Sequence, residues 1–477
     1  MSGSQSPETA DTIVALATPR GRGALGTVRL SGAHARALAR RLFRPWRDDP
    51  AFPPERTAVT GTALCPGGAA ETETIGRAGD AEAIDRGVLV FFPAAGSPTG
   101  EDLVEVTLHG SPTVLDLFVR GAVRAGARPA LPGEFSYRAF LNGRLDAIQA
   151  EAVDDLVRAR TAHQARAAYR QQSGALSRAV EEPRRLLVEW LARLEGSIEF
   201  SATEEEDFLD RDGLLAGIVA IRETLAYLLG TAERGLALSR GARVVLSGPV
   251  NAGKSCLFNA LVGFDRAIVS PHPGTTRDFI EAEVDWEGIP MTLVDTAGNR
   301  REESPDPVER EGRRRGAAVQ READLVLWLL DGSGKDMEPA PEPVSGGPLR
   351  LVIVSKTDAG WPEDHDAAAA AAGGPFLRVS ARTGEGLPQL RAQALELLAP
   401  GWDRSETPVV TRIRQQSCLA AAVRELDDGS ELASQGAGEE LVVVPMHRCL
   451  ERLAELTGRG GLEEIYDRIF ASFCIGK

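Results

Sequence analysis

Short apolar runs and longer helical patterns divide the chain into regions of different fold. Apolar runs at 12–17, 27–30, 87–92 and 103–110 predict strands, because each is short and bounded by turn residues, and residues 33–43 have helical periodicity. Residues 10 to about 145 are therefore expected to form a compact α+β domain.

From 141 to about 236 the periodicity becomes helical almost throughout. One apolar stripe consists of Ile148, Ala152, Leu156 and Val157, and a second includes Leu187, Trp190, Leu191 and Leu194. Pro183 is expected in or near the first turn of that second helix, where proline is tolerated. Helical character returns after 411, which suggests one bundle with another domain inserted into it.

Between about 240 and 400, buried-type strands alternate with helical patterns, as in an α/β doubly wound domain. The strands expected here are 244–246, 291–294, 325–331, 351–354 and 376–379. The glycine- and proline-rich stretch 333–348 is expected to be a surface loop.

Composition narrows the class of protein. The 477 residues are 43% hydrophobic and carry a net charge of −15, which is typical of a soluble chain of about three domains. No uninterrupted apolar run approaches the roughly 20 residues of a membrane helix. Five scattered cysteines without a CxxC pair fit a reducing cytoplasm better than a disulfide framework or a zinc site. The acidic balance excludes RNA binding by bulk charge alone, so RNA would need a local basic surface or a basic partner.

The segment 244–255 carries the clearest chemistry. Its apolar run ends in G-x-x-x-x-G-K-S, and a helical pattern follows. The glycines allow backbone N–H groups to surround phosphates, Lys254 can reach the β/γ-phosphates, and Ser255 can hold Mg²⁺. A glycine-rich turn before a helix is the bland alternative.

Four further motifs follow in order and remove that alternative. Thr276, in the loop 273–278, can sense the γ-phosphate and hold Mg²⁺, while Asp295 ends a strand and opens D-T-A-G. Asp358, in S-K-T-D, can accept the two N–H donors of guanine. These motifs, with S-A-R at 380–382, predict a P-loop GTPase. The expected GTP-binding residues are Asn251, Ala252, Gly253, Lys254, Ser255, Cys256, Ser270, Pro271, His272, Pro273, Gly274, Thr275, Thr276, Asp295, Thr296, Ala297, Gly298, Ser355, Lys356, Asp358, Ser380, Ala381 and Arg382.

Two positions depart from the usual GTPase pattern. Ser355 stands where most GTPases have asparagine, so guanine affinity is expected to fall while Asp358 keeps the preference. Asn299 follows D-T-A-G in place of the glutamine that orients the attacking water in Ras-like enzymes. Another group must then orient the water.

The stretches outside this domain resemble one family, the MnmE (TrmE) tRNA-modification GTPases. They are T-P-R-G-R-G-A-L-G-T-V-R-L-S-G at 18–32, T-G-E-D at 99–102, P-G-E-F at 132–135, R-A-F-L-N-G-R-L-D at 138–146 and S-F-C-I-G-K at 472–477. The resemblance covers nearly the whole chain. It implies a multidomain fold with an α+β folate-binding dimerisation domain (1–140), a helical domain in two parts (141–238 and 403–477) and an inserted α/β, Ras-like P-loop GTPase domain (239–402).

The resemblance also implies ligands in each domain. Arg29, Glu105, Arg144 and Lys477 match folate contacts for 5-formyl- or methylene-tetrahydrofolate, although Arg144 stands where lysine is expected. Potassium is implied at Asn251, Ser270, His272 and Thr275. In the phosphate loop, Pro249 and Val250 precede Asn251, whereas the family commonly has proline immediately before that asparagine.

Two further roles come from the resemblance. Glu309 matches the water-orienting glutamate, which would complete a catalytic set with Lys254 and Thr276. Cys474 is either a nucleophile toward the uridine ring or a small residue that shapes the folate pocket.

The family implies a cytoplasmic homodimer without membrane contact that hydrolyses GTP with K⁺. With an FAD-dependent partner of the MnmG/GidA type, in a heterotetramer, it would add an aminomethyl-type group at C5 of the wobble uridine of tRNA. The rival is a ribosome-assembly GTPase of the Era/Der kind, which needs an RNA-binding appendage such as a KH domain. A third reading, a regulatory GTPase with a degenerate site, rests on Ser355 and on Pro249 and Val250.

Overall fold

The computed structural model of the chain divides into two compact units, residues 1–154 with 454–477 and residues 155–453. Each unit is described by itself. The residues that the structure describes are 11–47, 52–66, 81–200, 210–249, 251–264, 280–296, 319–333, 347–360, 375–402, 410–459, 473 and 476.

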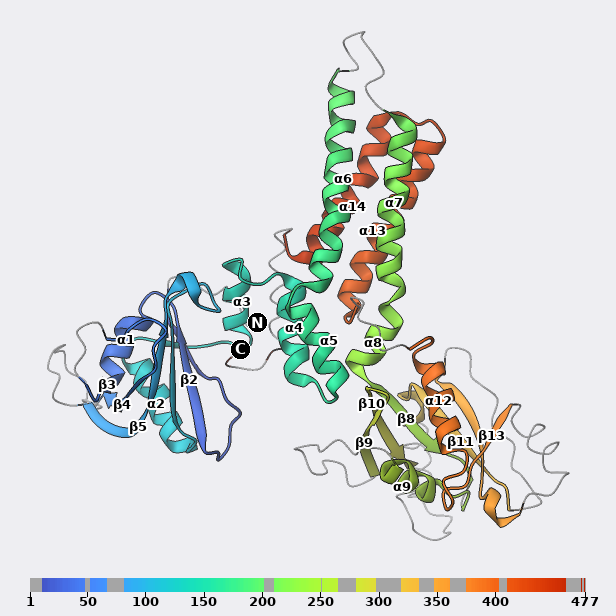
Figure 1. The fold of residues 1–477 in the computed structure, drawn as a ribbon, viewed down its shortest axis with the longest axis horizontal. Coiled ribbons are helices and arrows are strands. Elements are labelled where there is room, and N and C mark those ends of the chain that lie inside the picture. Colours follow the sequence, from blue (N-terminus) through green and yellow to red (C-terminus); the bar gives the residue numbers. More distant parts are fainter. Residues whose placement is uncertain are drawn as a thin grey trace, which may run out of the picture. The chain divides into compact units, whose positions relative to one another are not determined.

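The first unit is built on a seven-stranded sheet of order β3-β4-β5-β6-β2-β1-β7 (Figure 1). Only the β1–β7 pair is parallel. In chain order the elements are β1 (Ile13–Leu16), β2 (Leu25–Ser31), α1 (Ala35–Leu42), β3 (Phe43–Pro45), β4 (Val59–Pro66), β5 (Ala81–Phe92), η1 (Ala94–Gly96), β6 (Leu103–His109), α2 (Pro112–Arg124), β7 (Arg128–Pro129) and α3 (Glu134–Leu141).

One face of this sheet forms a hydrophobic core with α1 and α2. Val28 and Val106 point into it from neighbouring strands, where they meet Leu38 of α1 and Phe118 of α2. Because side chains alternate along a strand, the residue next to each of these valines points to the other face of the sheet. That other face carries Arg29 and Glu105, two of the folate candidates.

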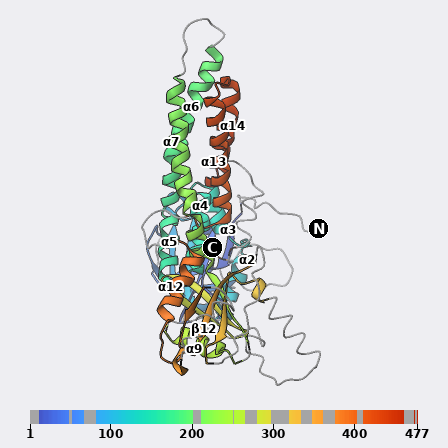
Figure 2. The ribbon, with the colours of Figure 1, turned by 90° about the vertical axis from the view of Figure 1, so that its right-hand side faces the viewer.

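Helices make up most of the second unit outside its sheet. After α4 (Ala147–Arg158), which crosses the boundary between the units, come α5 (Ala162–Gln172), α6 (Ala175–Phe200), α7 (Arg211–Gly230) and α8 (Ala232–Arg240). The bundle is completed by α13 (Ile413–Ser434) and α14 (Glu439–Thr457). Figures 1 and 2 show α6, α7, α13 and α14 side by side, and Arg222 of α7 forms an ion pair with Asp427 of α13 at 2.8 Å. Segments far apart in sequence thus form one bundle, which confirms the predicted insertion.

Two expectations about these helices need correction. Pro183 lies inside α6, well past the first turn that starts at Ala175; the helix tolerates the missing N–H and continues to Phe200. The segment Arg211–Arg240 is long enough and apolar enough, at a mean hydropathy of 1.5, to cross a membrane by those two measures. Within it α7 buries a stripe that includes Ile218 and Leu225, as a bundle helix does.

The inserted domain is a six-stranded sheet of order β13-β12-β11-β8-β10-β9, in which only β9 runs antiparallel. Its elements are β8 (Ala242–Ser247), α9 (Lys254–Phe264), β9 (Ile280–Trp286), β10 (Ile289–Asp295), β11 (Leu325–Asp331), β12 (Leu349–Ser355), η3 (Thr357–Ala359), β13 (Phe376–Arg378) and α12 (Leu387–Leu398). The predicted strands are all present. The sequence reading missed β9, an edge strand that is exposed at its start and buried at Val284 and Trp286.

The turn between β9 and β10 joins this domain to the helices. Thr161, which caps α5, donates from its Oγ1 to the Gly288 carbonyl oxygen at 2.6 Å. Gln164 Nε2 donates to the Leu238 carbonyl oxygen at 2.8 Å. The start of α5 is therefore hydrogen-bonded both to the turn of the β9–β10 hairpin and to the end of α8.

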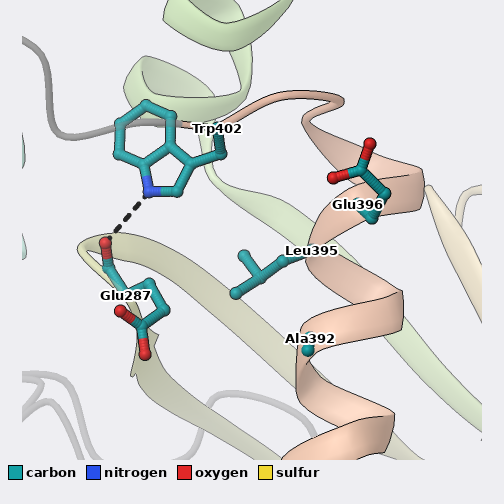
Figure 3. A pocket seen from close by; sticks show the side chains of 5 residues that line it. All are labelled: Glu287, Ala392, Leu395, Glu396 and Trp402. Carbon is teal, nitrogen blue, oxygen red and sulfur yellow. Dashed lines mark hydrogen bonds between the residues drawn. The ribbon is translucent and has the colours of Figure 1, made fainter.

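On its other side the same turn borders a pocket of about 230 Å³. Figure 3 shows Trp402 donating from its indole Nε1 to the Glu287 carbonyl oxygen, a distance of 3.2 Å. Leu395 and Glu396 of α12 line the pocket with Ala392. The hairpin turn lies at the opposite end of β10 from Asp295, so this pocket is separate from the nucleotide motifs.

Candidate functional site: a nucleotide site and a polar sheet face

The phosphate loop follows β8, and its glycines are required by its backbone. Gly248 has φ +138°, and a Cβ placed there would lie 2.4 Å from the Leu329 carbonyl oxygen. Gly253 has φ +88°. Asn251 also lies in the left-handed region, at φ +64°, which asparagine tolerates better than most residues. The loop thus curls ahead of α9, as phosphate binding needs.

Lys254, the first residue of α9, is only 9% exposed. Its Nζ donates to the carbonyl oxygens of Gly248, at 2.9 Å, and Pro249. Burial lowers the pKa of Lys254, and the negative charge of Asp295 partly opposes that effect. Neutral carbonyl oxygens therefore hold the ammonium group at the loop. Charged phosphate oxygens are stronger hydrogen-bond acceptors and could replace them.

The start of α9 presents the next predicted residues. Ser255 is half-buried in the first turn, Cys256 is an exposed free thiol, and Ala252 of the loop is fully buried. Backbone N–H groups in a first helical turn lack intrahelical partners and favour anions. This end of α9 can therefore add to an anion site.

Asp295 ends β10 beside the strand that leads into the phosphate loop. The parallel register pairs Asp295 with Leu246 of β8, and Asp295 is 1% exposed. Thr296 donates from its Oγ1 to the Leu246 carbonyl oxygen at 2.8 Å. The predicted D-T-A-G motif thus begins next to the phosphate loop, as parallel strand order requires.

Ser355 ends β12 and contacts the phosphate loop directly. Its hydroxyl lies 2.6 Å from the Ala252 carbonyl oxygen and 3.0 Å from that of Leu330. One hydroxyl hydrogen serves one of these acceptors at a time. Ser355 therefore links the base-recognition motif to the phosphate loop, but with a shorter side chain and only one donated hydrogen bond at a time.

Asp358 lies in η3, close to the S-A-R motif. Its Oδ1 accepts a hydrogen bond from Ser380 Oγ at 2.7 Å, and its Oδ2 lies 3.8 Å from Arg382 Nη1. Ser380 is fully buried, whereas the Arg382 side chain is 86% exposed. Ala381 between them packs against the core of the domain. The structure therefore brings the last two predicted motifs together.

Several predicted residues lie outside the described part of the chain. In the inserted domain they are Ser270, Pro271, His272, Pro273, Gly274, Thr275, Thr276, Ala297, Gly298 and Glu309, and near the C-terminus they are Cys474 and Lys477. Their roles remain predictions.

In the first unit, two folate candidates contact each other. Arg29 and Glu105 are opposite one another on β2 and β6, and Arg29 Nη2 lies 2.7 Å from Glu105 Oε1. The Arg29 guanidinium also lies over the Phe135 ring, 5.6 Å from its centre. Arg144 instead donates to the Ala94 carbonyl oxygen at 2.8 Å. The first two form a half-buried polar pair on the sheet face opposite the core, which Phe135 of α3 partly covers.

The described residues of the C-terminal motif contact this unit. Phe473 is buried against Tyr137 and Ala150. Gly476 has φ +99°, and a Cβ there would lie 2.3 Å from the Leu16 carbonyl oxygen at the end of β1. The end of the chain therefore lies against the N-terminal sheet, one strand away from Arg29.

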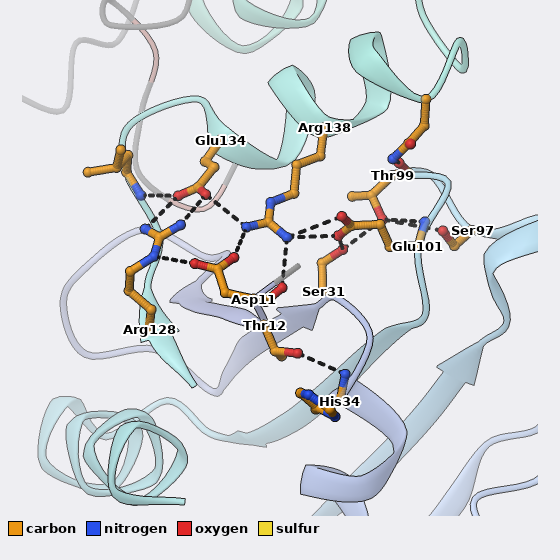
Figure 4. A network of polar contacts seen from close by, with 12 residues as sticks. Asp11, Thr12, Ser31, His34, Ser97, Thr99, Glu101, Arg128, Glu134 and Arg138 are labelled. Atoms are coloured by element: carbon orange, nitrogen blue, oxygen red, sulfur yellow. Dashed lines mark hydrogen bonds and ion pairs between the residues drawn. The ribbon is translucent and has the colours of Figure 1, made fainter. Parts of the chain in front are cut away.

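The motif residues Glu101, Glu134 and Arg138 form a buried network that the sequence reading did not foresee (Figure 4). Arg138, 1% exposed, pairs with Glu134 at 3.0 Å, with Glu101 at 3.1 Å and with Asp11. Arg128 bridges Asp11 and Glu134, each at 2.6 Å. These residues tie α3 to β1 and to the turn before β6. The spacing of P-G-E-F and R-A-F places Glu134 and Arg138 one helical turn apart, which is the signal that could have revealed the pair.

Comparison with known proteins gives two family matches. Residues 12–144 match the GTP-binding protein TrmE N-terminus, and residues 148–474 match the MnmE helical domain. The chain is 39% identical over 472 residues to the tRNA modification GTPase MnmE of Symbiobacterium thermophilum, and 40% identical over 471 residues to a tRNA modification GTPase MnmE of Thermus thermophilus. Each alignment covers 98% of this chain and 99% of the relative.

Solved structures of GTP-binding proteins match part of the chain. The G domain of the Thermotoga maritima FeoB iron transporter is 23% identical, with a TM-score of 0.24, over 33% of this chain and 98% of that one. Aquifex aeolicus Era is 20% identical, with a TM-score of 0.27, over 39% of this chain and 67% of that one. Likeness at this level does not favour the Era reading, whereas the full-length relatives decide the assignment: the chain belongs to the MnmE family of tRNA modification GTPases.

Proposed function

We propose that the chain binds GTP at the loop 248–255 and hydrolyses it with the help of K⁺. The observation that carries this is the convergence of Lys254, Asp295 and Asp358 at the C-terminal ends of β8, β10 and β12 in a chain of this family. Lys254 would exchange its carbonyl acceptors for phosphate oxygens, and Asp358 would accept the guanine N–H groups. The loss of water around the buried Lys254 strengthens its attraction to phosphate.

The residues present fit the proposed ions. The half-buried Ser255 follows the loop, and the buried Asp295 ends the strand beside β8; both side chains supply oxygen, the ligand that Mg²⁺ prefers. Thr276 would add a second hydroxyl. Asn251 is exposed and offers an amide oxygen to K⁺, with Ser270, His272 and Thr275 proposed beside it. A bound cation supplies positive charge where charge develops on the transferring phosphoryl group, and Glu309 is proposed to orient the water.

The sheet face around Arg29 and Glu105 is proposed to hold a tetrahydrofolate, which supplies a one-carbon unit. Guanidinium groups suit the carboxylates of its glutamate tail, and Glu105 can accept from the pterin N–H groups. Arg144 and Lys477 are proposed to add positive charge, and Gly476 already lies beside β1. Cys474 would then lie near this pocket, as a nucleophile or as a small wall residue.

The biological reaction is proposed as aminomethyl or carboxymethylaminomethyl addition at C5 of the wobble uridine of tRNA, in the cytoplasm. A homodimer of this chain would work with an FAD-dependent MnmG/GidA-type partner, whose flavin supplies the redox chemistry. The net charge of −15 agrees with a partner that supplies much of the RNA contact.

Multiple-turnover hydrolysis of GTP and ATP, in K⁺ and then in Na⁺ at equal ionic strength, tests the nucleotide part of the proposal. We expect fast turnover of GTP in K⁺ only. Equal rates in both salts would contradict the role of Asn251 and the loop 270–275. Nucleoside analysis of tRNA from a deletion strain that carries this gene tests the modification separately.

A further inference from the structure

An ion pair lies directly beside the segment that carries Asp358. Lys356 Nζ is 2.6 Å from Asp331 Oδ2, and each side chain is about one-third exposed, at 37% and 30%. Asp331 ends β11 and Ser355 ends β12, and the parallel register pairs these two residues. The pair therefore fastens the loop that leaves β12 to the loop that leaves β11.

Asp331 is itself oriented by its neighbours. Its Oδ1 accepts hydrogen bonds from the Ser333 N–H at 2.9 Å and from Ser333 Oγ at 2.6 Å. The Gly332 N–H donates to the Ser355 carbonyl oxygen at 3.0 Å. Burial alone would raise the pKa of Asp331, but the bonds from Lys356 and Ser333 outweigh it and lower that pKa. The carboxylate is thus an ionised anchor in a fixed position.

Lys356 needs such an anchor because its backbone is unfavourable. It has φ +59° and ψ +32°, a left-handed conformation that costs free energy in a residue with a Cβ. The 3₁₀ turn η3 starts at the next residue and contains Asp358. Because η3 follows directly after Lys356, the backbone conformation of Lys356 sets the orientation of the turn. The orientation of the Asp358 carboxylate therefore depends on how firmly Lys356 is held.

The serine at 355 makes this second anchor more important. Its single hydroxyl hydrogen faces two carbonyl oxygens, of Ala252 and Leu330, whereas an asparagine amide could donate to both. A Cβ on Gly253 of the phosphate loop would lie 3.5 Å from Ser355 Oγ and 3.8 Å from Lys356 Cε. Both side chains therefore lie close to the phosphate loop, and each helps to set the distance between that loop and Asp358.

We propose that Asp331 is a positioning residue for guanine recognition. Through its ion pair with Lys356, Asp331 holds the 3₁₀ turn that presents Asp358. It thereby replaces part of the second hydrogen bond that an asparagine at position 355 would donate and that Ser355 does not. This inference rests on the proposed role of Asp358 as the acceptor of the guanine N–H groups.

The test compares the affinities of fluorescent GDP and IDP for the full chain, because hypoxanthine lacks the exocyclic amine of guanine. Asp331→Asn is expected to weaken GDP binding about two- to fivefold, which corresponds to the free energy of a partly exposed ion pair. IDP binding should weaken less, so that the ratio of the two affinities shrinks. Asp331→Glu, which keeps the charge, should retain most of the ratio.

Asp324→Asn is the matched control, because Asp324 directly precedes the same strand at the end opposite Asp331 and accepts the Arg243 N–H at 2.7 Å. It should leave the GDP to IDP ratio unchanged even if it lowers stability. Ser355→Asn added to Asp331→Asn should restore GDP affinity, since the amide supplies a second tie to the phosphate loop.

An unchanged ratio in Asp331→Asn would overturn the inference, provided that Asp358→Asn abolishes the preference for GDP. If Asp358→Asn also left the ratio unchanged, the proposed guanine site itself would be wrong. If Asp331→Asn fails to fold, Asp331→Ser, which also removes the charge, is measured in its place, and an unchanged ratio of GDP to IDP affinity there contradicts the positioning role.

Discussion

The buried network of the first unit and the nucleotide site of the inserted domain are both made of motif residues, but they use their charges in opposite ways. In the network, Arg138 and Glu134 are almost fully buried and are paired with each other and with Asp11 and Glu101. In the nucleotide site, Lys254 has only backbone carbonyl oxygens as hydrogen-bond partners among the described residues. A motif whose charges are all paired internally maintains a fold, whereas a motif whose cation rests on neutral acceptors can exchange them for a ligand.

Replacing Arg138 tests the structural side of this comparison and has the largest expected effect on stability. Arg138→Met leaves the carboxylates of Asp11, Glu101 and Glu134 with Arg128 as the remaining cation of the network. Removing one partner of a buried ion pair costs about 3–5 kcal/mol. Calorimetry of the full chain should show the transition of the first unit at a markedly lower temperature, while GTP hydrolysis by the folded inserted domain continues.

The matched control is Arg120→Met in the same unit. Arg120 pairs with Asp116 at 2.8 Å on α2, with side chains 66% and 55% exposed. Such a surface pair contributes less than about 0.5 kcal/mol. Equal losses of stability in the two variants would contradict a special role for the network.

Lys254→Met tests the other side, where the effect should fall on catalysis and not on the fold. Loss of one cation that stabilises developing phosphate charge lowers turnover by about 10²–10³-fold. Stability should change by less than about 1 kcal/mol, because burial already disfavours the charged amine, as its lowered pKa indicates. Single-turnover hydrolysis gives the rate, and thermal unfolding of the same samples gives the stability. A large loss of stability with normal turnover would reverse the assignment.

The same contrast explains what the sequence could and could not predict. Strand-end motifs depend on local spacing, so the patterns predict Lys254, Asp295 and Asp358 at a nucleotide site. The α/β fold and the inserted position of that domain are confirmed, and the parallel strands bring these three motifs to one edge of the sheet. The Arg138 network joins residues 11, 101, 128, 134 and 138, and no local period connects carboxylates so far apart in the chain. Pro183 was misplaced for a related reason, since packing of α6 in the bundle outweighs the local preference of proline.

Acid sensitivity of the network gives the smallest effect. Burial alone would raise the pKa of Asp11, but hydrogen bonds from Arg128 and Arg138 outweigh it and lower that pKa. The pKa of Asp11 in the folded chain is thus below its unfolded value of about 3.9. The contribution of Asp11 to the free energy of unfolding is therefore present above about pH 4 and is lost as the pH falls through the lowered folded value.

Below pH 4 the wild type should lose on the order of 1 kcal/mol more stability than Asp11→Asn, measured by urea unfolding between pH 3 and 6. Asp116→Asn, which changes an exposed pair, should follow the wild type, and if Asp11→Asn does so as well, the carboxylate of Asp11 is not the titrating group.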